Sequence, residues 1–221
     1  NGLHPFPRNR PASREAPQCG KCHIRLADVA ESKGDLETWE RLSIEAADRF
    51  QAAGGGNVSG SIWVSVGLHR MRRGDYSGAM EAAHRALGFD LDASSAMRAG
   101  LIEAQSLGAQ GKWAESSKRF EELMTAAGHD PDLWDQIIGT AGAMTEVEIK
   151  RLVIRRFEKV QTFIQFPPEL VLPIRVQCIA LEAHATGRFV EGLAKIKAIL
   201  TGLTPDIVLP ETVLLTANEL A

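Results

Sequence analysis

Hydrophobic residues recur along this chain at intervals of three and four, the spacing of one face of an α-helix. The clearest example is Trp63–Leu87, where the pattern predicts two short amphipathic helices joined by a tight turn at Arg73-Gly74-Asp75. The residues expected on the packed faces of these two helices are Trp63, Val66, Gly67 and Arg70, then Tyr76, Ala79, Ala83 and Ala86. Large residues open each helix and small ones follow, which favours close approach of the two backbones at their crossing.

Similar turns recur at Gly34, Gly111 and Gly187, each between two helical patterns. With Gly74, the four turn glycines are separated by 40, 37 and 76 residues, and the last interval is about two periods. The arithmetic predicts five helix pairs, so the fold class is all-α. If these glycines close the turns, we expect them to adopt positive φ angles.

Seven residues of the first stretch carry a family resemblance: Trp63, Gly67, Gly74, Tyr76, Ala79, Ala86 and Leu87. In type and spacing they resemble the tetratricopeptide repeat, a helix–turn–helix unit of about 34 residues. The resemblance implies a right-handed α-solenoid of about five antiparallel helix pairs. It also implies a protein-binding scaffold, because the first helices of such repeats line an inner groove.

The pattern divides the chain into an extended proline-rich arm (1–18), a repeat domain (19–205) and a tail or capping helix (206–221). Within the repeats, Gly54–Gly56 is expected to be a flexible junction, with Ser59 or Ser61 capping the next helix. Asp130 and Pro131 are expected to start a helix as N-cap and first-turn residue.

One unit departs from the pattern. Its first helix is marked by Trp134, Ile137, Ile138 and Ala141, and its turn at Thr145-Glu146 has no glycine. Its second helix is expected to run unusually far, over Val147–Gln165, until Pro167-Pro168 ends it.

Composition changes this picture little. The 221 residues carry a formal charge of −3 with a pI near 6.1, which gives no reason to expect nucleic acid as the partner. No apolar run approaches the roughly 18 residues of a membrane span. The chain begins with Asn1, so we expect a processed form or a fragment. No catalytic constellation is apparent, and the chain is not expected to be an enzyme.

The stretch Cys19-Gly20-Lys21-Cys22-His23 resembles the attachment motif of c-type haem, in which two thiols bond the haem and the histidine binds the iron. Haem c is thus a possible cofactor, although the fold requires none, and it would imply an extracytoplasmic location in place of a cytoplasmic one. The alternatives are a zinc site formed by His4, Cys19, Cys22 and His23, or a first helix that merely contains two cysteines. The candidates for a sixth iron ligand are His4, His69, Met71 and His84.

Two surfaces are candidates for a protein partner. The family register places nine residues in the inner groove: Val64, Leu68, Met71, Arg72, Leu101, Gln105, Gln177, Leu181 and His184. The second surface is a basic face on the predicted long helix, formed by Lys150, Arg151, Arg155, Arg156 and Lys159, opposite an apolar face. Relatives that clamp a chaperone carboxylate use Asn where Leu68 stands, so that specialisation is not expected. Cys178 lies in an apolar helical pattern and is expected to be a core thiol.

Two functions follow. The first is a scaffold, expected as a subunit or assembly factor of a larger complex, that binds a partner segment near Trp134–Phe166 and at Leu101, Gln105 and Leu181. The second is an electron-transfer subunit that carries haem at Cys19, Cys22 and His23 and docks through its repeats.

Overall fold

The computed structural model describes residues 15–161 and 168–201, and this part of the chain is helical with no β-strand. Its ten helices are α1 (Glu15–Ser32), α2 (Leu36–Ala52), α3 (Gly56–Arg72), α4 (Tyr76–Leu87), α5 (Ala93–Ala109), α6 (Trp113–Ala127), α7 (Pro131–Ala143), α8 (Val147–Gln161), α9 (Pro168–Thr186) and α10 (Phe189–Thr201). The all-α prediction is confirmed.

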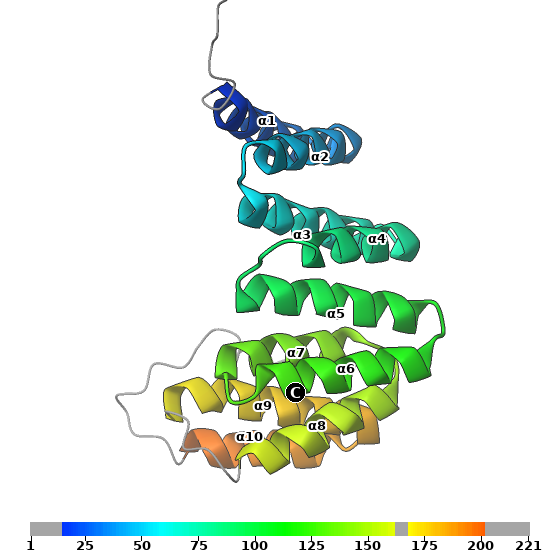
Figure 1. Ribbon diagram of the computed structural model, residues 1–221. Helices are drawn as coiled ribbons and strands as arrows, with labels where there is room; N and C mark the ends of the chain where they lie inside the picture. Colours follow the sequence, from blue (N-terminus) through cyan, green and yellow to red (C-terminus); the bar gives the residue numbers. More distant parts are fainter. Residues whose placement is uncertain (1–14, 162–167, 202–221) are drawn as a thin grey trace, which may run out of the picture.

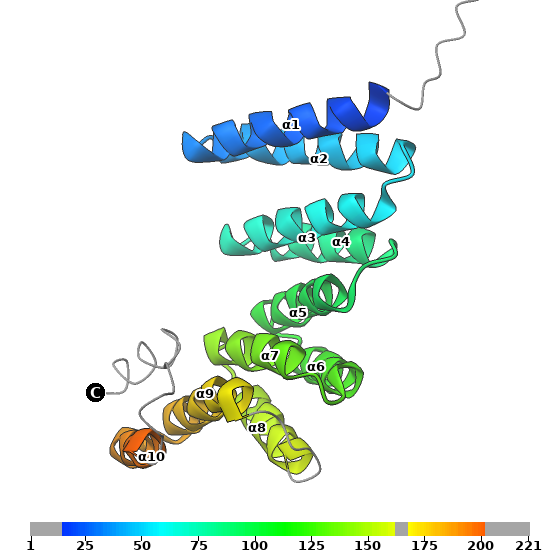
Figure 2. The ribbon, with the colours of Figure 1, turned by 90° about the vertical axis from the view of Figure 1, so that its left-hand side faces the viewer.

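The helices form five successive antiparallel pairs, α1–α2 through α9–α10, stacked along one axis (Figure 1). Each pair packs on the next, and the first helices α3, α5 and α7 also contact one another across the pairs. The pairs change direction along the stack: α1–α4 lie across the view of Figure 2, whereas α10 is seen nearly end-on. Residues 15–161 and 168–201 thus form a twisted solenoid of five helix pairs, as expected.

Four of the turns inside the pairs use glycine in the left-handed region. The φ angles of Gly34, Gly74, Gly111 and Gly187 lie between 70° and 78°. At Gly74 the hydrogen bonds explain why the turn uses a residue of positive φ. The Gly74 N–H donates to the carbonyl of Met71 (3.0 Å) and the Asp75 N–H to that of Arg70 (3.0 Å), which is the Schellman arrangement that ends a helix through a residue of positive φ. The prediction of positive φ at the turn glycines is confirmed.

Small residues allow the helices of α3–α4 to approach closely. Ala79, Ala82, Ala83 and Ala86 of α4 are fully buried. A Cβ on Gly67 of α3 would lie 3.3 Å from the Ala79 carbonyl oxygen, a contact that only a small shift could relieve. The resemblance to the repeat pattern is therefore strongest where two backbones nearly touch.

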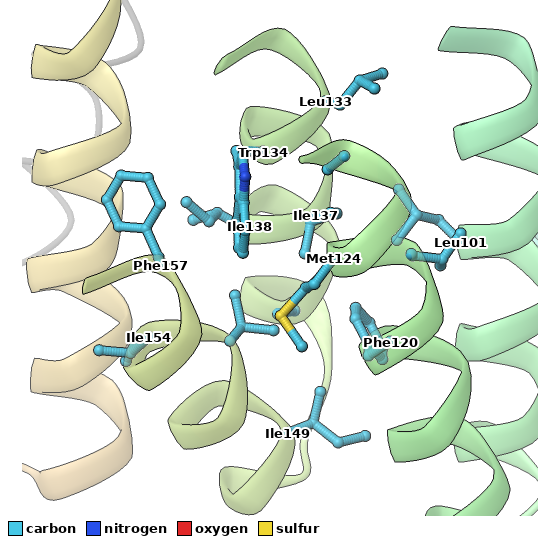
Figure 3. Packing of buried hydrophobic residues seen from close by; sticks show 14 of the residues in the cluster. Leu101, Phe120, Met124, Leu133, Trp134, Ile137, Ile138, Ile149, Ile154 and Phe157 are labelled. Atoms are coloured by element: carbon cyan, nitrogen blue, oxygen red, sulfur yellow. The ribbon is translucent and has the colours of Figure 1, made fainter. Parts of the chain in front are cut away.

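The pair α7–α8 is packed differently, around large side chains (Figure 3). Trp134 of α7 is fully buried, its ring centroid lies 5.5 Å from that of Phe157 on α8, and its indole N–H donates to the carbonyl of Gly128 (3.2 Å). Ile137, Ile138 and Ile149 fill the same core. The turn between the helices has no positive φ, since Met144 is extended at φ −82° and ψ 152°.

Several local expectations were wrong. Helix α1 begins at Glu15, inside the expected arm. Helix α3 begins at Gly56 with Gly55 as N-cap, whereas Ser59 is buried within it. Gly54 (φ 79°) forms a Schellman turn at the end of α2. Asp130 does cap α7, with Pro131 in its first turn, as predicted.

The length of α8 does not set it apart. Its 15 described residues are fewer than the 19 of α9 and the 18 of α1, and the expected extension to Gln165 falls outside the described residues. The same holds for the predicted arm up to Arg14 and for the tail 206–221. Among the helices that the structure describes, none is both long and apolar enough to cross a membrane.

Candidate functional site

The first candidate site is a groove of about 340 Å³ at the edge where the two helices of a pair are joined. We call it the edge groove. Its lining comes from three consecutive pairs: Met71, Tyr76, Gln105, Ala109, Trp113, Ala143, Met144 and Thr145. The first helices α3, α5 and α7 contribute their ends, so a segment lying in the groove would contact three repeats at once.

The turns place the aromatic side chains of this groove. Tyr76 and Trp113 each stand two residues after a turn glycine, at the first position of α4 and α6. Both are half-buried and keep part of their ring area at the surface. Sequence reasoning placed Tyr76 in the core, and that expectation was wrong, because the start of the second helix lies at the rim of the stack and not in its middle.

Only some of the residues predicted for the inner groove lie together in the structure. Met71 and Gln105 line the edge groove, Leu68 is half-buried nearby in sequence, and Arg72 is exposed. Val64, Leu101 and Leu181 are buried, with exposed fractions of 4–5%, and they belong to the core. These three cannot meet a partner without unpacking, so their assignment to the groove was wrong.

The two remaining groove residues lie on α9. Gln177 interacts with the carboxyl group of Asp135, and desolvation raises the pKa of Asp135 above its ordinary value. His184 is exposed and stacks edge-on with Phe189 at a ring distance of 5.2 Å. Neither residue lines the edge groove, so the predicted surface is not continuous.

The second candidate site is a groove of about 430 Å³ between α6 and α8. We call it the basic groove. It is lined by Glu121, Met124 and Thr125 of α6 and by Leu152, Arg155, Arg156 and Lys159 of α8. Of the five residues of the predicted basic face, Lys150 is half-buried, Arg151 pairs with Glu148 (2.6 Å), and only the other three reach this groove.

A cluster of charged side chains joins the first two helix pairs and lines a third groove. Glu40 of α2 accepts a hydrogen bond from the Arg70 guanidinium of α3 (2.7 Å) and lies 3.6 Å from Arg73. His69 stacks on Trp39 at 4.6 Å, and neither ring nitrogen has a hydrogen-bond partner. Desolvation, together with the charge of Arg73, lowers the pKa of His69. The charges here satisfy one another, so we assign this cluster to packing.

The Cys19-x-x-Cys22-His23 stretch lies inside α1. Cys22 is exposed, while His23 turns toward α2, with its Nε2 atom 3.2 Å from a Glu45 carboxylate oxygen. A haem iron would need that nitrogen, so the residues as placed do not fit iron ligation by His23. The side chain of Cys19 and all of His4 are outside the described set.

The other proposed ligands lie apart from His23. His69 is packed on Trp39, Met71 lines the edge groove, and His84 pairs with Glu103 (3.1 Å). Within residues 15–161 and 168–201, no group of three or more His, Cys, Asp or Glu side chains could hold a metal ion. Haem and zinc binding therefore stay predictions that no contact seen here supports.

The remaining cysteine behaves as expected. Cys178 of α9 is buried beside Leu181 in the core, and burial raises the pKa of its thiol well above the ordinary range. A thiol with so high a pKa is protonated at neutral pH and is a poor nucleophile.

Of the eight residues that line the edge groove, only Met71 and Gln105 were predicted as inner-groove residues, and sequence reasoning did not give the aromatic residues Tyr76 and Trp113 this role. An aromatic residue two positions after a turn glycine was the available signal, since that position begins the second helix at the rim. No protein-family model matches the chain, and the search of curated proteins found no match either.

Proposed function

We propose that this chain is a protein-binding scaffold of the tetratricopeptide type, which holds an extended partner segment in the edge groove. The observation that carries the proposal is the groove itself. Three consecutive helix pairs contribute to one surface, and its largest side chains, Tyr76 and Trp113, keep ring area exposed. Partly exposed aromatic side chains over several repeats are typical of a recognition surface.

The chemistry of the groove suits a peptide. Tyr76, Trp113 and Met71 offer apolar area for one or two partner side chains, and thioether side chains adapt to different shapes. Gln105 has both a donor and an acceptor, so it can bond main-chain groups of an extended segment. Of the residues that the structure describes, no charged side chain lines the groove, which favours a segment whose bound side chains are apolar or uncharged.

The test is selection of binding peptides from a random display library, followed by affinity measurement on variants. We expect enriched peptides to bind Gln105→Lys at least about tenfold more weakly than the wild type, because the variant places a buried charge against the bound segment. Tyr76→Ala should weaken binding by a similar factor.

Val190→Lys is a suitable control, since Val190 is 84% exposed and lies on α10, outside the edge groove. It should leave the affinity unchanged. Enriched peptides that bind both Gln105→Lys and Tyr76→Ala as tightly as the wild type would show that this groove is not the binding surface.

A further inference from the structure

The basic groove is separate from the edge groove and has a different character. Its floor is apolar, formed by buried Met124 and half-buried Leu152. Three cationic side chains, Arg155, Arg156 and Lys159, lie along its α8 wall, against a single carboxylate, Glu121, on the α6 wall. The groove is therefore locally cationic in a chain whose formal net charge is −3.

Two of these cations have no compensating partner in the part of the chain that the structure describes. Arg155 and Arg156 are exposed, and neither forms an ion pair or hydrogen bond with any residue that the structure describes. One turn earlier on the same helix, Arg151 pairs with Glu148 at 2.6 Å. On α6, outside the groove, Arg119 pairs with Glu103 (2.8 Å) and Glu122 (2.9 Å). Among the described residues, uncompensated charge is thus a property of Arg155 and Arg156 and not of arginines in these helices generally.

The spacing of the three cations adds to this contrast. Lys159 follows Arg155 by four residues and Arg156 by three, so Lys159 is a neighbour of each on the helix surface, where like charges repel. An anionic ligand would remove that repulsion. Because Leu152 and Met124 line the same groove as the charges, the ligand should also present an apolar side chain.

We propose that the basic groove binds an acidic, amphipathic segment of a protein partner. Carboxylates of the segment pair with Arg155 and Arg156, which can each form two parallel hydrogen bonds to a carboxylate. An apolar side chain of the segment rests on Leu152 and Met124. Glu121 on the facing wall repels carboxylates there and so fixes which side of the segment faces α8. This site stands independently of the edge groove.

Charge and apolar floor together favour this occupant over a nucleic acid. A phosphate-binding surface gains affinity from many cations and is weakened by a carboxylate in its centre. The basic groove has few cations, includes Glu121, and offers apolar area that a phosphate backbone would not cover.

The test uses a fluorescent synthetic peptide that alternates glutamate and leucine at helical spacing. Its binding to the full chain is compared with that of the same peptide carrying lysine for glutamate, and with polyglutamate. We expect the acidic amphipathic peptide to bind, polyglutamate to bind more weakly, and the lysine peptide not to bind. Added salt should weaken the binding.

Arg155→Glu/Arg156→Glu should reduce the affinity about tenfold or more. The matched control is Lys21→Glu/Arg25→Glu on α1, which makes the same charge change at two exposed positions and should leave the affinity unchanged. Circular dichroism melting shows whether each variant folds. Arg155→Gln/Arg156→Gln provides a second, milder variant, expected to lie between the wild type and the charge reversal.

Four results would overturn the proposal. The first two are an unchanged affinity in the Glu double variant and an equal loss in the control variant. The third is binding of single-stranded DNA as tightly as the acidic peptide, which would indicate a polyanion site. The fourth is a wild-type dimer in analytical ultracentrifugation that the Glu double variant converts to monomer, which would make a second copy the occupant.

Discussion

The pairs α3–α4 and α7–α8 have the same architecture but are built from different sequences. In α3–α4 the turn needs Gly74 at φ 78°, and the core of α4 consists of four buried alanines. In α7–α8 the turn is extended at Met144, and the core holds Trp134 and Phe157. The comparison shows that the repeat pattern in the sequence indicates how closely two helix backbones approach. It does not indicate whether a helix pair is present.

The largest expected effect tests the core of α7–α8. Trp134→Ala removes a fully buried indole that contacts Phe157 and hydrogen-bonds Gly128, so we expect a loss of about 3–5 kcal/mol in the free energy of unfolding. Chemical denaturation of the purified variant measures it. A loss below about 1 kcal/mol would show that this pair is not held by its large side chains.

The second prediction tests the turn of α3–α4. Gly74→Val forces a β-branched residue into the left-handed region and should cost about 1–3 kcal/mol. The control is Gly139→Ala in α7, where the glycine is helical, exposed and has no atom near the position of a new Cβ. That change should stabilise the chain by roughly 0.5–1 kcal/mol. Destabilisation of equal size at both glycines would remove the special role assigned to the turn.

The features that could be predicted from the sequence also differ between regions with and without the repeat pattern. The turn glycines and the helix start at Asp130-Pro131 were predictable, because few residues satisfy a positive φ or a helix N-terminus. The assignment of Leu101 and Leu181 to a surface failed because neighbouring repeats, not the local pattern, decide which side of a first helix is covered. Met144 lies inside the region Trp134–Phe166 where a partner contact was expected, but nothing in the sequence pointed to Met144 itself, since its extended backbone replaces the glycine turn.

The third prediction concerns the large residue that begins α4. Tyr76 occupies the position that the repeat pattern reserves for an aromatic residue, yet it is half-buried at the rim. Tyr76→Ala should therefore cost about 1 kcal/mol, well below the cost of Trp134→Ala. Parallel denaturation of the two variants checks the order. A Tyr76 cost equal to that of Trp134 would place its ring in the core after all.

The smallest effect expected is a pH dependence confined to the N-terminal pairs. His69 of α3 is mostly buried against Trp39, and desolvation lowers its pKa in the folded chain below the unfolded value near 6.5. Arg73 and Arg72 lower it further, whereas Glu40 and Glu31 oppose the shift.

The direction of this pH effect follows from which state of the chain, folded or unfolded, binds more protons. In the window from the unfolded pKa down to the lower folded pKa, the unfolded chain binds more protons, so acidification favours unfolding. The contribution of His69 is therefore fully present above pH 6.5 and is lost as the pH falls below it. No histidine occurs in α7 or α8, and the raised pKa of Asp135 acts in the opposite direction at lower pH.

Amide hydrogen exchange at pH 7.5 and 5.5, corrected for the intrinsic rate, resolves the two regions. Protection in α2 and α3 should fall relative to that in α7 and α8, and His69→Gln should abolish the difference between the regions. A uniform loss of protection along the stack would mean that the pairs unfold as one unit. In that case α3–α4 and α7–α8 would differ in how they are packed, but not in how they respond to pH.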